Sequence, residues 1–165
     1  MVEASSLSHD DEPLSTVNVV AGETWWQQWS WQDGKLIHFV PMTWTFPTGI
    51  TPKRLWDLWF FGDRGIGIRP YRLIHRTDIS IKDKMHYSRA NSVINFIKKI
   101  MEEENINCPG KTLVQWTILE SDECFQRAWI ILKERLYQRN VAREHEVSYG
   151  TIYNKICKSR KVSEP

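Results

Sequence analysis

The sequence lacks the features that mark several large classes of protein. It contains no run of about 18 apolar residues, so we expect no membrane-spanning segment. Its first 24 residues have neither a basic start nor an apolar centre, so we expect no secretory signal. The three cysteines, Cys108, Cys124 and Cys157, stand far apart, and no C-x-x-C pair indicates a zinc site. We therefore expect an intracellular protein with reduced thiols.

Signatures of catalysis are scarce as well. The five histidines show no metal-ligand spacing such as H-x-x-x-H. The acidic cluster Asp10-Asp11-Glu12 stands in a polar stretch that we expect to be disordered, where nothing would hold it in a catalytic arrangement. A chain of 165 residues is also short for a tyrosine recombinase, whose catalysis needs arginines, a His-x-x-Arg pair and a tyrosine nucleophile. We expect no enzyme, no cofactor and no metal.

The glycines of the stretch Gly62 to Arg69, GDRGIGIR, do not match a nucleotide-binding loop. Their spacing is G-x-x-G-x-G, without the Lys-Ser/Thr of a phosphate loop. A dinucleotide fingerprint would need a buried strand before it and a helix after it, whereas an amphipathic Trp-rich segment precedes this stretch. The glycines therefore predict the end of one helix and a turn into the next.

Charge is unevenly distributed along the chain. Residues 1–24 contain five acidic residues and no Lys or Arg, so they carry −5, and residues 25–165 carry +7 of the total of +2. An acidic leader on a basic body is consistent with a body that binds a polyanion. A solubilising tail on an ordinary surface would give the same distribution, and charge alone leaves both interpretations open.

Composition and periodicity predict a mainly α protein. Hydrophobic residues make up 41 % of the chain, with nine tryptophans, which is enough for a core. We expect a disordered acidic leader at 1–24 and a helical domain at 25–165. Within that domain we expect an aromatic β-hairpin at 25–45, core helices at 51–106 and C-terminal helices at 112–165. The hairpin turns at Asp33-Gly34, and its tryptophans are suited to packing, with stacking on nucleic-acid bases as the alternative.

The helices can be placed more closely. Thr51 and Pro52 are typical of a helix start, and Gly62 is typical of an end. We expect a short helix at 70–75, an extended link at 79–81, a long helix at 84–104 and a further helix at 121–138. Residues 112–118 fit a strand or a helix start equally well. The buried side of the helix at 121–138 is expected to consist of Phe125, Trp129, Ile130, Leu132 and Leu136.

The segment from Ala142 to Ile156, AREHEVSYGTIYNKI, has the layout of a helix-turn-helix. Ser148 would cap the second helix, and Ile152 and Ile156 would face the core. Glu146 stands where such turns usually carry glycine, so a plain helical hairpin with a basic end remains the alternative. The residues expected to face outward are Tyr149, Gly150, Thr151, Tyr153, Asn154 and Lys155.

Three stretches in order resemble a known family. They are LWDLWFFG at 55–62, Pro70-Tyr71, and SRANSVINFIKKI at 88–100. Together they resemble the DNA-binding domain at the C-terminus of the yeast glycolytic-gene transcription activator, which is also found in proteins of crypton-type mobile elements. The resemblance covers about residues 43–104. It implies a compact helical domain that binds DNA, with the long helix from about Lys84 as its recognition element.

We therefore expect a nuclear DNA-binding protein, either a transcription regulator or a mobile-element derivative. The alternative is a protein-interaction module that uses the Trp-rich hairpin and binds no nucleic acid. Basic side chains near the glycine turn could contact phosphates, or could form ion pairs with Asp57, Asp63 and Asp78. The candidate DNA-binding residues are Lys53, Arg54, Arg69, Arg72, Arg76, Arg89, Lys98, Tyr149, Thr151, Asn154, Lys155, Lys158 and Arg160.

Overall fold

The structure, a computed structural model, describes residues 44–63, 65–66, 68–74, 79–137 and 147–163, together with the backbone of two short strands before them. In this part the chain is mainly α, as predicted. The α-helices are α3 (Pro52–Phe61), α4 (Ile81–Glu103), α5 (Ile118–Tyr137) and α6 (Tyr149–Ser163). Two 3₁₀ helices, η2 (Tyr71–Leu73) and η4 (Leu113–Gln115), lie between them. No helix of the described part is both long enough and apolar enough to span a membrane.

The two strands are β1 (Trp31–Gln32) and β2 (Lys35–Leu36), which pair antiparallel with Trp31 opposite Leu36. Their side chains and the rest of residues 1–43 lie outside the described residues. The packing of the predicted aromatic hairpin and the disorder of the leader therefore stay predictions.

Helix α3 begins and ends where the sequence predicts. The Thr51 hydroxyl accepts a hydrogen bond from the Arg54 amide at 3.2 Å, and Pro52 occupies the first turn. The apolar side of the helix, which includes Leu55, Trp56 and Trp59, is buried in the core. Gly62 is the C-cap, and its amide donates to the carbonyl of Leu58.

The loop after α3 closes on Gly62. The backbone groups of Asp63 and Ile68 pair through two hydrogen bonds of 2.8 and 2.9 Å, so the chain returns directly over the glycine. Gly62 has φ 75° and ψ −172°, a conformation that essentially only glycine adopts. A Cβ atom here would lie 2.6 Å from the Ile68 carbonyl oxygen and 2.7 Å from the Pro70 nitrogen.

We expect Gly62→Ala to lower the free energy of unfolding by about 3 kcal/mol, because the new methyl group meets rigid backbone at a disfavoured φ. Gly49→Ala is the matched control, since Gly49 also has a positive φ, of 73°, but has nothing within 4 Å of the added atom. It should cost about 1 kcal/mol. Urea unfolding followed by circular dichroism measures both. Equal losses for the two variants would contradict the role given to the close approach at Gly62.

Helix α4 starts at Ile81, earlier than expected, so the prediction of an extended link through Ile81 is wrong. The reason is the Ser80 hydroxyl, which accepts a hydrogen bond from the Asp83 amide at 3.3 Å and caps the helix. The Asp83 carboxylate is buried and accepts from the Phe46 amide at 3.0 Å, which ties the segment before α3 to the start of α4. The short helix predicted at 70–75 is the 3₁₀ helix η2.

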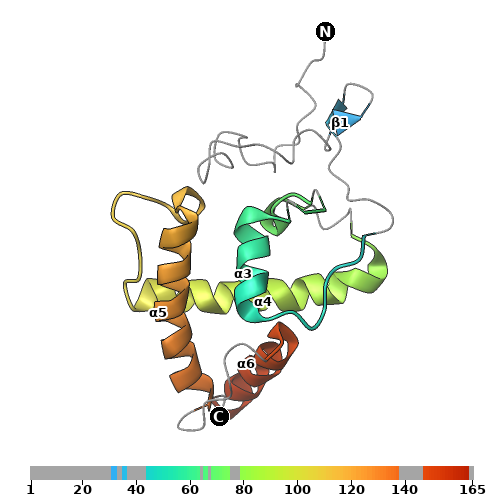
Figure 1. Ribbon diagram of the computed structural model, residues 1–165. Coiled ribbons are helices and arrows are strands. Elements are labelled where there is room, and N and C mark those ends of the chain that lie inside the picture. Colours follow the sequence, from blue (N-terminus) through green and yellow to red (C-terminus); the bar gives the residue numbers. More distant parts are fainter. Residues whose placement is uncertain are drawn as a thin grey trace.

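Helix α4 is the centre of the fold. It lies across the molecule in Figure 1 and contacts α3, α5 and α6. Ala90, Val93, Ile94, Ile97 and Ile100 are fully buried at helical spacing and join the other helices in one hydrophobic core. Only one stripe of α4 remains exposed, because the other sides are covered by neighbouring helices.

Helix α5 begins at Ile118, three residues before its predicted start. Residues 112–118, whose sequence fits a strand or a helix start equally well, form η4 and then the cap of α5. Thr117 and Glu120 form a reciprocal capping box, in which the Glu120 amide donates to the Thr117 hydroxyl at 3.2 Å and the Thr117 amide to the Glu120 carboxylate at 2.9 Å. The expectation that Ile130 is buried is wrong, because it is 54 % exposed and its neighbour Ile131 packs against the core instead.

The capping carboxylate gives a pH-dependent prediction. Hydrogen bonds from Lys111, at 2.8 Å, and from Thr117 lower the pKa of Glu120 to about 2. A carboxylate with a lowered folded-state pKa contributes stability above its ordinary pKa of 4.5, and this stability is lost as pH falls towards 2. We expect the wild-type chain to lose more unfolding free energy between about pH 5 and about pH 2.5 than Glu120→Gln does. Urea unfolding at both values tests this, and equal losses would contradict it.

Candidate nucleic-acid interface

Helix α6 is positioned by its first turn and its apolar stripe. The Ser148 hydroxyl accepts a hydrogen bond from the Thr151 amide at 3.3 Å, as predicted for the cap. Ile152 and Ile156 are fully buried, also as predicted. Residues 138–146, which would hold the first helix and the turn of the predicted helix-turn-helix, lie outside the described residues. The helix-turn-helix itself therefore stays a prediction.

Tyr149 is a correction to the predicted site. Its side chain is only 2 % exposed, so it does not face outward. The hydroxyl donates to the Pro47 carbonyl at 2.8 Å, the backbone amide donates to the Ile50 carbonyl at 2.9 Å, and burial raises the pKa of the phenol to about 12. The physical reason is position, because Tyr149, Ile152 and Ile156 fall on one helix face and together dock α6 on the core.

The opposite face of α6 is exposed. Thr151, Asn154, Lys158 and Lys161 stand at helical spacing and form a stripe, which we call the α6 face. The helix contains four Lys and Arg residues and no acidic residue between Tyr149 and Ser163. An exposed helix face with hydroxyl, amide and ammonium groups and without carboxylates is able to donate hydrogen bonds to anionic oxygens.

The two edges of the α6 face are basic as well. On one side, the guanidinium carbon of Arg89 from α4 lies 5.5 Å from the ring centre of Tyr153, and Arg160 is exposed beyond it. The pKa of the Tyr153 hydroxyl is raised, mainly by a hydrogen bond with the Cys157 thiol. The positive charges of Arg89 and Arg160 act in the opposite direction and lower it. On the other side, the Lys155 ammonium lies 5.1 Å from the ring centre of Tyr137 on α5.

The exposed stripe of α4 adjoins the edge of the α6 face at which Arg89 contacts Tyr153. Ser88 and Asn95 are exposed, and the hydroxyl of half-buried Ser92 donates to the Ser88 carbonyl at 3.1 Å. Arg89 lies beside this stripe and also touches α6. Arg89 thus links α6 to the polar part of the α4 stripe, from Ser88 to Asn95, whereas Ile81 and Met85 at the start of the same stripe are exposed and apolar.

The predicted basic residues near the glycine loop lie elsewhere. Arg69 is 5 % exposed, so its guanidinium is not accessible to a phosphate, and Arg72 is half-buried. The Lys53 ammonium is held at 2.6 Å by Asp57 and at 2.6 Å by Asp122. Sequence periodicity does not apply to these loop and helix-start positions, so their burial and pairing depended on tertiary contacts.

Two other predicted residues, Arg54 and Lys98, also fall outside the surface formed by α4 and α6. Arg54 is exposed and lies 3.5 Å from Asp63. Arg76 lies outside the described residues. Lys98 stands nine positions after Arg89 on α4, which is two and a half helical turns, so the two side chains leave opposite sides of the helix.

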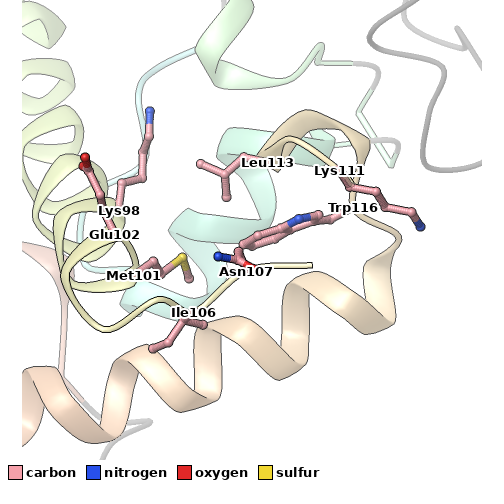
Figure 2. Close-up of a pocket in the computed structure, with 8 residues that line it drawn as sticks. All are labelled: Lys98, Met101, Glu102, Ile106, Asn107, Lys111, Leu113 and Trp116. Atoms are coloured by element: carbon pink, nitrogen blue, oxygen red, sulfur yellow. The ribbon is translucent and has the colours of Figure 1, made fainter. Parts of the chain in front are cut away.

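Lys98 instead borders a hollow of about 270 Å³ at the far end of α4. Figure 2 shows Met101, Leu113 and the indole of Trp116 around this hollow, with Lys98 and Glu102 on the α4 side and Lys111 on the other. The nearby acidic residues Glu102, Glu103 and Glu104 make this end of α4 unsuited to a phosphate backbone. Of the four described α-helices, α6 alone has basic residues and no acidic residue.

Among the described residues, no group of three or more His, Cys, Asp and Glu side chains could hold a metal ion. Comparisons with protein-family models, with curated proteins and with solved structures gave no match.

Proposed function

We propose that this protein binds duplex DNA through the α6 face and the adjoining polar stripe of α4. The observation that carries the proposal is the exposed stripe of Thr151, Asn154, Lys158 and Lys161 on a helix that has no acidic residue. Lys and Arg side chains that neutralise phosphates release the counterions of DNA, which supplies most of the non-specific affinity. Hydroxyl and amide groups between them are suited to base edges.

The helix geometry supports a division of roles within this surface. The side chains of Thr151 and Asn154 are exposed in the first turns of α6 after its cap, where recognition helices contact base edges. Lys158 and Lys161 lie further along the same stripe and would contact the phosphate backbone. Arg89, held against Tyr153, would contact phosphate from α4. Helix α4 is covered by neighbouring helices and exposes only one stripe. We therefore assign the leading role in DNA contact to α6.

This function agrees with the resemblance to the crypton-related DNA-binding domain, and we propose on that basis a nuclear protein that is a transcription regulator or a mobile-element derivative. The family's recognition element would be α4, whereas the exposed charges of this chain favour α6. A fluorescence anisotropy titration of labelled random duplex DNA, repeated over a salt series, tests the function. We expect binding that weakens linearly in log salt, and no binding at about 50 mM salt would overturn the proposal.

The competing proposal is a protein-interaction module built on the Trp-rich hairpin. A partner recovered from nuclease-treated extract, and lost on changing Trp26 and Trp29 together, would support it. Substitution of Trp26 and Trp29 should leave binding to duplex DNA intact if the α6 face binds DNA. The two proposals are thus separated by one variant and two assays.

We propose no catalysis, although His86 and Arg89 do stand at the His-x-x-Arg spacing of tyrosine recombinases. Arg89 packs on the ring face of Tyr153, an arrangement that Arg and Tyr adopt in ordinary packing. Supercoiled plasmid incubated with the protein should therefore remain uncut and unrelaxed. A covalent protein–DNA adduct that is lost in Tyr153→Phe would overturn this part of the proposal.

A further inference from the structure

Two of the three cysteines are close together in space. The Sγ atoms of Cys108 and Cys124 lie 3.9 Å apart, although 15 residues separate them in the sequence. A disulfide requires the sulfurs to come to about 2 Å, a change that small side-chain rotations provide when the backbones are already near. The third cysteine, Cys157, lies on α6 beside Tyr153.

The backbone holds each thiol of this pair in place. Cys108 opens a tight turn in which the Lys111 amide donates to the Cys108 carbonyl at 3.1 Å. Pro109 and Gly110 occupy the middle positions, and Gly110 has φ 78°, as the third residue of a type II turn requires. Cys124 is fixed on the buried side of α5. The Lys111–Glu120 ion pair, at 2.8 Å, ties the turn to the start of the same helix.

From this geometry we propose that Cys108 and Cys124 are an oxidation site of the folded protein, where hydrogen peroxide converts the two thiols into a disulfide. The roles of the two sulfurs follow from their exposure. Cys108 is half-buried and reachable, whereas Cys124 is 3 % exposed. Cys108 is therefore the thiol that reacts with peroxide, and Cys124 is the thiol that resolves the product.

Hydrogen peroxide oxidises the two thiols in two steps. The Cys108 thiolate attacks one peroxide oxygen, an S–O bond forms, the O–O bond breaks, and the leaving hydroxide takes a proton to become water. The Cys124 thiolate then attacks the sulfur of the Cys108 sulfenic acid, the S–S bond forms, the S–O bond breaks, and the leaving hydroxide takes a proton from solvent to become a second water. Burial raises the pKa of both thiols, so the reaction is expected to be slow at neutral pH.

Trypsin separates the three cysteines into different peptides, 100–111, 112–127 and 156–158, which makes the pairing readable by mass spectrometry. The full chain is treated with hydrogen peroxide, alkylated and digested without reduction. We expect the main cross-link to join peptides 100–111 and 112–127. The same treatment in urea should give mixed pairings that include 156–158, because only the fold selects the pair.

Variants and a second readout complete the test. Cys157→Ser should keep the cross-link and Cys108→Ser should lose it. The oxidised chain should melt about 5 °C higher than the reduced chain, an effect that dithiothreitol reverses, because the bond closes a short loop. A folded chain that gives only Cys108 oxygen adducts, or the same mixture of pairings as the unfolded chain, would overturn the proposal. Neither readout uses DNA, so the result is independent of the proposed function.

Discussion

Lys158→Glu/Lys161→Glu is expected to weaken binding to duplex DNA by at least about tenfold at about 0.15 M salt, because two phosphate contacts are replaced by two repulsive charges. The slope of log affinity against log salt should also fall by about 2, since each lost phosphate contact removes about 0.9. Both lysines are exposed, and the buried side of α6 is unchanged, so the fold should persist. Fluorescence anisotropy over a salt series measures the affinity and the slope together.

The matched control for this variant is Lys98→Glu/Arg127→Glu. Both positions are exposed basic residues, so the net charge changes equally, but Lys98 borders the hollow at the far end of α4 and Arg127 lies on α5. Only long-range electrostatics should act in the control, and these are screened beyond about 8 Å at physiological salt. Equal losses in the two variants would show that net charge, rather than the α6 face, determines affinity.

Trp56→Ala is expected to lower the free energy of unfolding by about 3–5 kcal/mol, the largest effect on stability that we expect from a single substitution here. Trp56 lies on α3 and is fully buried against α5. The centre of its ring lies 4.5 Å from that of Phe60 on α3 and 5.8 Å from that of Phe125 on α5. Its indole nitrogen donates to the Ser121 hydroxyl at 2.8 Å. The truncation creates a cavity and also leaves the buried hydroxyl without this partner.

Two comparisons separate these contributions. Trp56→Phe keeps most of the ring but loses the donor, so it should cost clearly less than Trp56→Ala. Leu119→Ala is the surface control, because Leu119 is 79 % exposed and its loss should stay within about 0.5 kcal/mol. Urea unfolding followed by far-ultraviolet circular dichroism avoids the loss of tryptophan fluorescence. A cost below about 1 kcal/mol for Trp56→Ala would contradict the placement of this residue at the centre of the core.

The helices could be predicted from the sequence because their signals are local. Thr51-Pro52 and Gly62 mark both ends of α3, and the apolar spacing of α4 and α6 is plain. The start of α5 is also marked locally, since Thr117-Ile118-Leu119-Glu120 is a capping box, and the prediction of a start at 121 overlooks this signal. The exposure of Ile130 was missed because two adjacent isoleucines leave the phase of a helix open, and tertiary packing decides it.

The candidate site was predicted less completely, for a physical reason. Thr151, Asn154 and Lys158 follow from helical periodicity, whereas the expectation that Tyr149 faces outward counts only Ile152 and Ile156 as core, although Tyr149 continues their stripe. The burial of Arg69 depends on how a loop folds back, which no local pattern encodes. The approach of Cys108 to Cys124 depends likewise on a turn meeting a distant helix.

The most direct test of the α6 face is a map of backbone amide chemical shifts during titration with duplex DNA. We expect the largest shifts at residues 151–161 of α6 and around Arg89 on α4, while the amides of α5 and of the hollow around Trp116 stay nearly unchanged. Shifts centred on α5, on the hollow or on the segment before α3, or no shifts at all at low salt, would contradict this expectation.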